Sequence, residues 1–483
     1  MHRLLPCLLG LMLCSSCGAA RSTSGPAPGK AGTETVTFTL RAEPRDAGYR
    51  IEDAAGQAHS GTLPFEGDLP VGPLRWTVSA ANHRTESGEI DLHEATGHFA
   101  CLDLPGQLVD CRVAAHLPVP PWTDRALDRE KREGGPKALL LPPGTDEIWV
   151  AVLVGPSALI VYSRSTGEAL TRIPLGDEGL GAVEFEITAD GKTVYVSQLE
   201  SSLIFEIDRA SKRVLRSFSA FGEWPKILEL SADETKLYVS NWSSGNIAEI
   251  ELATGELARD LPGTVVPRGL YATRDGRFLY LAGFGSGEFR RIDLASGDSE
   301  LLFQDTASLR HIVADEERGR FFISDLKNAR ILTFDLASGE TRVFATVHPK
   351  PNTIRLSPDG RVLYVSSRGP NNPVNWLDPG PQWGAITLLD AETGESLDLV
   401  VAGNQPTAMD LSRDGRQLVV SDFIDNRIRL FDLPDTETLR SGEGGRATQA
   451  LTELPKVGWE GWIPDNELPP PPEDPEDPED PKE

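Results

Sequence analysis

The chain has 483 residues, of which 39% are hydrophobic and 25% charged, and it contains 46 Gly and 37 Pro. This length allows two or more domains, and the many turn-forming residues favour short strands over long helices. The formal net charge is −26, and so acidic a surface repels phosphate backbones, which argues against general nucleic-acid binding. No internal run of apolar residues reaches the ~18–20 that a membrane helix needs.

The first residues have the pattern of an export signal. Arg3 precedes an apolar stretch of about ten residues and then small residues, which is typical of a secretory signal peptide. The stretch CSSCG, residues 14–18, resembles a bacterial lipoprotein signal in which Cys17 becomes the lipidated mature N-terminus, and with no Asp after Cys17 it resembles those sorted to the outer membrane. We therefore expect a signal over residues 1–17 and a flexible tether over residues 18–33. A plain cleaved signal peptide is the alternative.

The remaining cysteines agree with export. Only Cys101 and Cys111 lie outside the predicted signal, and a Pro-Gly turn separates them. In an oxidising compartment this spacing predicts a hairpin disulfide. A zinc site is a weaker alternative, because two thiols without further ligands bind zinc poorly.

Residues 34–115 predict a small β-sandwich-like domain. Apolar and polar residues alternate there, as in TVTFTLRAEP, and Gly and Pro interrupt them. The order of its parts, with IEDAAG at Ile51, LPVG at Leu69 and WTVSAANH at Trp76, resembles the PEGA-type surface domain. The Pro-rich and then charged segment that follows, residues 116–136, is predicted to be a linker.

Beyond the linker the chain repeats a unit of about 42 residues. Each unit pairs a hairpin such as LSPDGRVLYVS at Leu356 with a second hairpin such as ILTFDLASGE at Ile331. Four short strands in each of seven copies predict an all-β, seven-bladed β-propeller over residues 137–455. The two signatures resemble the YVTN-repeat, or YncE-like, propeller family. The outer strand of the last blade is expected either near Arg446 or from the segment before Leu139.

The last segment, residues 456–483, ends in the acidic, Pro-rich sequence PPPPEDPEDPEDPKE. Such a composition cannot bury a core, so we expect the segment to be extended and disordered. Along the whole chain no catalytic motif stands out, and the sequence predicts no catalytic residue, no cofactor and no metal.

Binding sites on propellers lie in the loops at one face of the ring. The repeat register places equivalent polar residues at the start of four consecutive innermost strands. They are Lys226, Arg268, Arg310 and Asn352, and Thr407 and Val183 hold the same slot in two other blades. Three neighbouring cations at one channel mouth suit a carboxylate, sulfate or phosphate group. The alternative is that each cation pairs with an acid of a neighbouring blade.

A second set of candidates follows the LYVS-type strands on the same face. Trp242 and Phe284 are expected to form an exposed apolar patch, whereas Leu199 and Leu326 are expected to pack between blades. The longest such loop, SRGPNNPVNWLDPGPQWGAI, combines Trp and Arg, which dominate recognition hot spots, with stiffening prolines. It is predicted to bring a set of residues to the rim, or alternatively to pack over the blade edge. The set is Arg368, Asn371, Asn372, Trp376 and Trp383.

These features predict an exported protein of the bacterial cell envelope, anchored as an outer-membrane lipoprotein. We expect a non-catalytic recognition or scaffold protein that binds a protein, a glycan or an anionic ligand at one face of the propeller, and that contacts neither nucleic acid nor, beyond its lipid, the membrane. One alternative is a hydrolase or lyase, because propellers that resemble lactonases catalyse at this face; Asp325 and Asp422 would then be metal ligands. A structural spacer is the other alternative.

Overall fold

The structure is a computed structural model that describes residues 34–43, 47–80, 85–93, 96–101, 117–118, 134–154, 157–176, 181–372, 380, 382 and 384–441. The predicted signal with its lipidation site Cys17, the tether and the acidic C-terminal segment lie outside this range. So do Trp376, Trp383 and Cys111, and with Cys111 the predicted disulfide.

The N-terminal unit is a β-sandwich of two sheets. The first has the order β4 (Phe65–Pro70), β1 (Thr35–Glu43), β7 (Thr96–Cys101), and the second has the order β3 (Ala58–Thr62), β2 (Gly48–Glu52), β5 (Gly72–Ser79), β6 (Glu86–Leu92). In β5, Leu74, Trp76 and Val78 alternate with more exposed residues and point into the core. They meet Phe38 and Leu40 of β1, so one apolar layer joins the two sheets.

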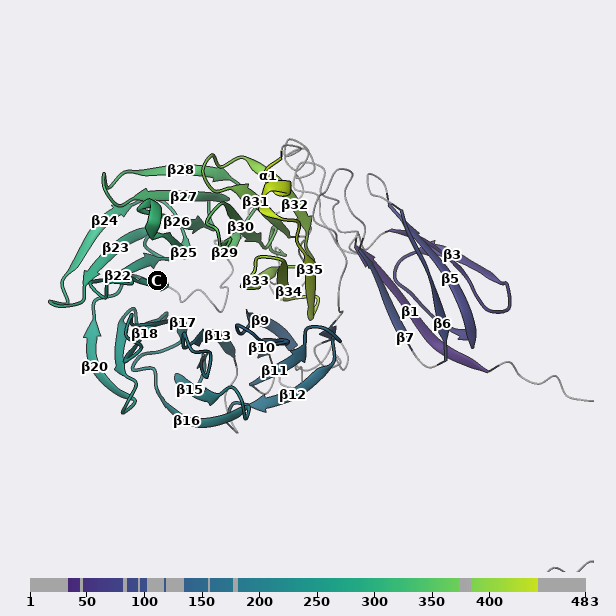
Figure 1. Cartoon of the computed structure of the whole chain (residues 1–483), viewed down its shortest axis with the longest axis horizontal. Coiled ribbons are helices and arrows are strands. Elements are labelled where there is room, and N and C mark those ends of the chain that lie inside the picture. The colour runs from purple at the N-terminus through teal and green to yellow at the C-terminus, as the bar shows by residue number, and fades with distance from the viewer. Residues whose placement is uncertain are drawn as a thin grey trace, which may run out of the picture.

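The second unit is a seven-bladed β-propeller, and each blade is a four-stranded sheet (Figure 1). Blades 1 to 3, each written from the innermost strand outward, are β9 (Gly134–Leu140), β10 (Glu147–Val154), β11 (Ala158–Ser163), β12 (Ala169–Pro174); β13 (Ala182–Ile187), β14 (Thr193–Gln198), β15 (Leu203–Asp208), β16 (Arg213–Ser219); and β17 (Pro225–Leu230), β18 (Lys236–Asn241), β19 (Ile247–Glu251), β20 (Glu256–Leu261). Blades 4 and 5 are β21 (Pro267–Ala272), β22 (Phe278–Gly283), β23 (Glu288–Asp293), β24 (Ser299–Gln304); and β25 (Leu309–Asp315), β26 (Arg320–Asp325), β27 (Arg330–Asp335), β28 (Thr341–Thr346). Blade 6 is β29 (Pro351–Leu356), β30 (Val362–Ser367), β31 (Ala385–Asp390), β32 (Ser396–Val401).

The seventh blade closes the ring with a strand from before the first blade. Its strands are β33 (Pro406–Leu411), β34 (Gln417–Asp422), β35 (Arg427–Asp432) and, outermost, β8 (Leu117–Pro118). The innermost strands contact one another in a closed cycle in which β33 meets β9. The segment expected to be a linker therefore contributes β8 and the start of β9 to the ring. Of the two sources expected for the outer strand of the last blade, the segment before Leu139 is therefore the one seen in the structure, and Arg446 lies outside the described residues.

The recurring Asp-Gly and Thr-Gly pairs form the tight turns of each blade. In blade 6, the Asp359 carboxylate accepts a hydrogen bond from the backbone N–H of Arg361 at 3.1 Å, and Gly360 has φ +69°, which favours glycine. In the second hairpin of that blade, Asp390 accepts the N–H of Glu392 at 2.8 Å and that of Thr393 at 3.0 Å. The acidic residues of the repeat signature therefore hold the turns in shape.

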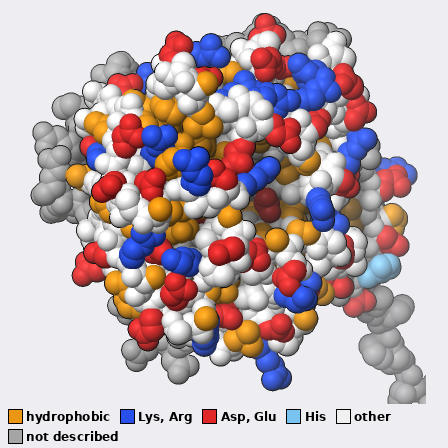
Figure 2. Space-filling model, turned by 60° about the vertical axis from the view of Figure 1, so that its left-hand side comes forward, with side chains coloured by type: hydrophobic (Ala, Val, Ile, Leu, Met, Phe, Trp, Pro, Cys, Tyr) orange, Lys and Arg blue, Asp and Glu red, His pale blue; other side chains and the backbone are white. Residues whose placement is uncertain are grey.

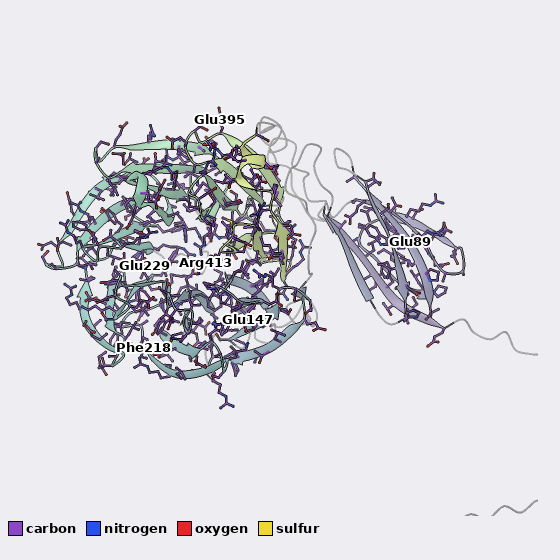
Figure 3. All side chains as sticks on the ribbon, viewed as in Figure 1. Glu89, Glu147, Phe218, Glu229, Glu395 and Arg413 are labelled. Atoms are coloured by element: carbon purple, nitrogen blue, oxygen red, sulfur yellow. The ribbon has the colours of Figure 1, made fainter. Side chains whose placement is uncertain are left out.

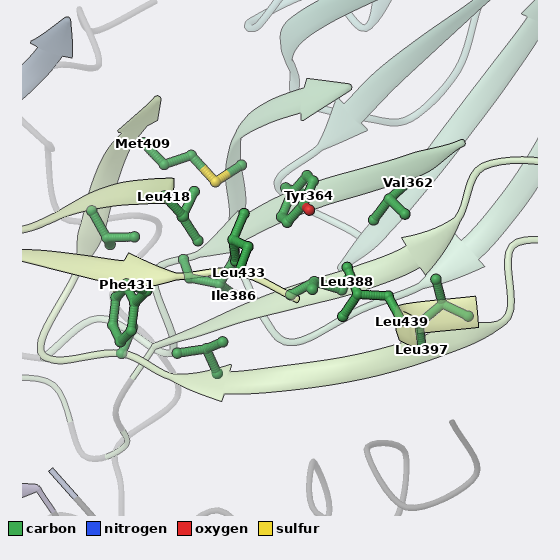
Figure 4. Packing of buried hydrophobic residues seen from close by; sticks show 13 residues of the cluster. Val362, Tyr364, Ile386, Leu388, Leu397, Met409, Leu418, Phe431, Leu433 and Leu439 are labelled. Atoms are coloured by element: carbon green, nitrogen blue, oxygen red, sulfur yellow. The ribbon is translucent and has the colours of Figure 1, made fainter. Parts of the chain in front are cut away.

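Apolar residues on both faces of each blade form the cores between blades. Figure 4 shows the cluster between blades 6 and 7, where Tyr364 of β30, Met409 of β33 and Phe431 of β35 are buried together. The short helix α1 (Thr436–Arg440) adds Leu439 to this cluster, and Asp435 caps the helix by accepting the N–H of Thr438 at 2.8 Å. On the face drawn in Figure 2, Lys and Arg are interspersed with Asp and Glu. Among the described residues, no helix is long and apolar enough to span a membrane.

Candidate functional site

The start of the innermost strands brings the predicted polar residues to one mouth of the channel. In blades 3 to 6 the strand register shifts directly after the first residue of the innermost strand, as it does between Pro225 and Leu228. Such a bulge re-aims the side chains that lie in it. The residues at this bulge are the four that the repeat register singled out: Lys226, Arg268, Arg310 and Asn352.

The first blade adds a cation that the sequence analysis missed. Lys137 of β9 lines the same channel cavity as Arg268 and Asn352, and it is also buried. The first repeat is degenerate, so its register did not reveal this residue. We use the name cationic mouth for Lys137, Lys226, Arg268 and Arg310.

The cations of the mouth lie against aromatic rings. Lys226 Nζ is 5.0 Å from the centre of the Trp242 ring, and the Arg268 guanidinium is 5.2 Å from the same ring. The Arg310 guanidinium is 5.8 Å from the Phe284 ring. At these distances the negative face of an aromatic ring attracts a cation, so the rings stabilise positive charge in a buried place.

The prediction that Trp242 and Phe284 form an exposed patch is wrong. Their side chains are 1% and 8% exposed, and their ring centres lie 5.1 Å apart in a cluster with Val266 and Leu326. The loops turn inward because the N–H of Trp242 donates to Trp224 O at 3.0 Å, and the N–H of Phe284 donates to Val266 O at 2.9 Å. The aromatic residues therefore form a packed layer that supports the cationic mouth. Leu326 is buried between blades, as expected.

Asn352 links three blades at the mouth. Its Oδ1 accepts a hydrogen bond from Arg310 Nε of blade 5, and its Nδ2 donates to Thr407 O of blade 7 at 2.8 Å. The amide therefore orients the Arg310 guanidinium, which makes Asn352 a positioning residue.

The start of the long blade-6 loop packs against blade 7. Arg368 is buried, its guanidinium donates to Gln405 Oε1, and its N–H donates to Lys350 O at 3.0 Å. Asn372 is buried as well, so neither residue has the rim exposure that the sequence suggested. For this part of the loop the alternative, packing over the blade edge, describes the structure.

The two proposed metal ligands, Asp325 and Asp422, are buried at the ends of second strands. Asp325 accepts hydrogen bonds from the N–H of Ser308, from Asn328 and from Arg330. These partners hold the loop that enters the innermost strand of the blade. Among the described residues, no group of three or more His, Cys, Asp and Glu side chains has the arrangement of a metal site.

Asp422 has the same role in blade 7. Its Oδ1 accepts from the N–H of Gly403 at 2.8 Å and from Arg429 at 3.0 Å, and its Oδ2 accepts from Arg427 at 2.9 Å. Other blades have an amide at this position: Asn241 donates to the carbonyl oxygen of Ala220 at 3.0 Å. Because the side chain at this position forms hydrogen bonds with loop backbone atoms in several blades, we interpret both carboxylates as structural.

Deeper in the channel, Arg355 organises a second group of polar residues. Its guanidinium lies 3.3 Å from His311 Nε2 and 3.5 Å from Asp410 Oδ1. Burial lowers the pKa of His311 well below 6.5, and the positive charges of Arg355, Arg268 and Arg310 lower it further, so the imidazole is neutral at pH 7. His311 is one of only two histidines in the propeller sequence, but no motif connected it with Arg355.

Towards the opposite end of the innermost strands the channel becomes acidic. Burial raises the pKa of Glu186, Glu229 and Asp410, and that of Glu186 reaches about 7. Glu229 accepts the N–H of Ala272 at 2.9 Å, and Figure 3 places it near the centre of the ring. The channel is therefore polar along its axis, but the two signs of charge are mixed. Glu184 of β13 lines the same cavity as Lys137 and Arg268, and Arg355 lies beside Asp410 further along.

Replacing Glu186 by glutamine should stabilise the folded protein at high pH. The folded-state pKa of Glu186, about 7, lies above its ordinary value of 4.5, so folding retains a proton that the unfolded chain releases. This stability is present in full below pH 4.5 and is lost as the pH rises through 7. We expect a gain of about 1–3 kcal/mol in unfolding free energy at pH 8. Urea unfolding at pH 4 and pH 8 checks this, with the exposed Glu256→Gln as control, and an equal effect at both pH values would contradict it.

The ring and its polar channel define a seven-bladed β-propeller, and comparisons with known proteins agree with that class. The family model described as "Lactonase, 7-bladed beta-propeller" matches residues 166–271. Antigen Lp49 of Leptospira interrogans is 50% identical over 86 residues, which make up 18% of this chain and 19% of that protein, so the match spans less than a fifth of that relative's length. The Kuenenia stuttgartiensis hydrazine synthase superposes with a TM-score of 0.53 over 64% of this chain and 98% of that chain. At 17% identity this likeness shows the fold alone.

Proposed function

We propose that this protein is an exported, non-catalytic recognition protein of the cell envelope that binds an anionic ligand at the cationic mouth of its propeller. The observation that carries the proposal is the gathering of four cations at one end of the channel, in a chain with a net charge of −26. Lys137 and Arg268 line one cavity, Lys226 lies with Arg268 against the Trp242 ring, and Arg310 is bonded to Asn352 of that cavity. In so acidic a protein, four buried cations at equivalent strand positions form a local field that attracts anions.

The surroundings of the cations strengthen this field. The Trp242 and Phe284 rings exclude water below the cations, and electrostatic attraction is stronger where the dielectric constant is low. Asn352 holds the Arg310 guanidinium in one orientation, which reduces the entropy lost on binding. A planar, fixed guanidinium suits a carboxylate, phosphate or sulfate group.

The resemblance of the N-terminus to a lipoprotein signal supports the envelope location, as does the resemblance of the sandwich to the PEGA-type surface domain. The relative that is named as an antigen also supports an envelope location. The repeats resemble those of YncE-like propellers. The hydrolase alternative has less support, because the lone pairs of Asp325 and Asp422 are used by their own neighbours.

The test compares anion binding by the unmodified protein and by a Lys226/Arg268/Arg310→Gln variant. Calorimetric titration with sulfate, phosphate and citrate should show binding to the unmodified protein and at least about a 100-fold loss in the variant, because charge-assisted hydrogen bonds disappear. A control variant, Arg213/Arg274/Arg413→Gln, removes three exposed cations and the same charge. If no anion binds the unmodified protein, or if both variants bind equally well, the proposal is wrong. Urea unfolding verifies that each variant is folded.

A further inference from the structure

The channel cavity brings opposite charges together around the axis of the ring. Its lining residues come from six of the seven innermost strands, which are β9, β13, β21, β25, β29 and β33. Glu184 of β13 supplies a carboxylate, and Lys137 of β9, Arg268 of β21 and Arg355 of β29 supply three cations. The cavity therefore offers a ligand both signs of charge.

The cations are not the most accessible groups of this cavity. Lys137 and Arg268 are buried, whereas Glu184, His311 and Thr353, each the third residue of its strand, are half-buried. A ligand that enters the channel therefore meets the Glu184 carboxylate as well as the cations. That carboxylate weakens the attraction of the cavity for a simple anion, because like charges repel most strongly where water is scarce.

The Glu184 carboxylate can accept a hydrogen bond from a ligand. Its Oε1 accepts from the N–H of Phe185, in its own strand, at 3.3 Å. Burial raises the pKa of the Glu184 carboxyl above its ordinary value, although Arg355, Arg268 and Lys137 act through space to lower it. Among the described residues, no lysine or arginine forms an ion pair with this carboxylate. A buried carboxylate is best stabilised by a positively charged donor, so an ammonium group fits beside Glu184.

His311 does not supply that positive charge. Its imidazole is neutral at pH 7, and its Nε2 lies 3.3 Å from the Arg355 guanidinium. Arginine has no acceptor, so Nε2 accepts the hydrogen bond and Nδ1 carries the ring proton. Arg355 is also 3.5 Å from Asp410, which balances its charge. The charges that the cavity presents to a ligand are therefore mainly those of Lys137, Arg268 and Glu184.

We propose that the channel cavity binds a small α-amino acid, with its carboxylate towards Lys137 and Arg268 and its ammonium towards Glu184. This rests on the proposed function, because it names the ligand class of the same site: the anionic group is a carboxylate with an ammonium on the adjacent carbon. Such a zwitterion pairs with both signs of charge and has no net charge, so the acidic protein does not repel it. Ala408 and Met409 are apolar parts of the lining and suit a short aliphatic side chain.

The test uses calorimetric titration with L-alanine, L-lactate and propionate, which share one carbon skeleton. Alanine carries an ammonium beside its carboxylate, lactate carries a hydroxyl, and propionate carries neither. The unmodified protein should bind alanine at least about 10-fold more tightly than the other two, because only the ammonium has a charge opposite to that of Glu184. If propionate binds as tightly as alanine, Glu184 recognises no donor and the inference is wrong. If lactate does so, the ligand is a hydroxy acid and the inference is also wrong.

A Glu184→Gln variant tests the role of the carboxylate directly. It should bind alanine at least about 10-fold more weakly than the unmodified protein and should bind propionate no more weakly, because a repulsive charge is gone. The control, Glu186→Gln, removes the same charge two residues further along β13, at a position outside the lining of this cavity, and should leave both affinities unchanged. Urea unfolding verifies that each variant is folded. Unchanged alanine affinity in Glu184→Gln would overturn the inference.

Titration of the unmodified protein with sulfate separates this inference from the proposed function. If sulfate binds and alanine does not, the inference is wrong and the proposed function stands. If alanine binds as expected and sulfate, phosphate and citrate do not, the cavity recognises a zwitterion and the proposal that it binds anions is wrong. If none of these compounds binds, both proposals fail.

Discussion

Replacing Asp422 by alanine should destabilise the propeller by about 3–5 kcal/mol. Asp422, Arg427 and Arg429 form an ion cluster in which Asp422 and Arg429 are fully buried, with Arg429 Nε 2.7 Å from Asp422 Oδ2. Burial acts to raise the pKa of Asp422, but Arg429 and Arg427 outweigh it and hold the pKa below its usual value. Without the carboxylate, two guanidiniums lose their counter-charge and the N–H of Gly403 loses its acceptor.

The measurement is the urea midpoint of the Asp422→Ala protein. Asp422→Asn should give a smaller loss, because its amide oxygen still accepts the N–H of Gly403. Glu256→Ala removes an exposed carboxylate of the outer strand β20, and it should leave the midpoint unchanged. A loss below about 1 kcal/mol for Asp422→Ala would show that water reaches the cluster and would contradict the structural interpretation. That result would also return Asp422 to consideration as a metal ligand.

Replacing Phe289 by alanine should cost about 3–5 kcal/mol, because it opens a cavity between blades 4 and 5. The Phe289 ring is fully buried and contacts four aromatic rings at centre distances between 5.3 and 5.7 Å. They are Tyr280 and Phe303 of its own blade and Phe321 and Phe334 of the next. The change therefore removes packing within a blade and across a blade interface together.

Urea unfolding measures this loss, and Leu301→Ala provides a matched control. Leu301 lies in the outer strand of the same blade with its side chain 45% exposed, so its truncation should cost less than about 1 kcal/mol. Phe289→Leu should fall between the two, because leucine fills part of the cavity. If Phe289→Ala and Leu301→Ala lowered the free energy of unfolding equally, the aromatic cluster would not stabilise the interface between blades 4 and 5.

The repeat register was the most informative property of the sequence. It predicted a seven-bladed propeller and placed Lys226, Arg268 and Arg310 at equivalent positions, and both results are seen in the structure. This succeeded because strand period and turn residues are local properties, so copies of one unit must adopt the same backbone. Lys137 was missed because its repeat has lost the signature.

The repeat register did not predict that the loop residues are buried. Trp242, Phe284 and Arg368 follow strands at positions where exposure was expected, yet all three are buried. Which side a loop turns to depends on backbone hydrogen bonds such as that from Trp242 to Trp224, and on the rings of the adjacent blades. These contacts are made between residues that the repeat pattern treats independently.

The sequence by itself determined the fold class, the number of blades and the residues that occupy the bulge of the innermost strand in blades 2 to 7. Only the tertiary structure decided that β8 closes the ring, that Arg355 joins His311 and Asp410, and that Glu184 shares a cavity with Lys137 and Arg268. Turns and strands depend on neighbours along the chain, whereas ring closure and the charge of the channel depend on seven innermost strands meeting around one axis.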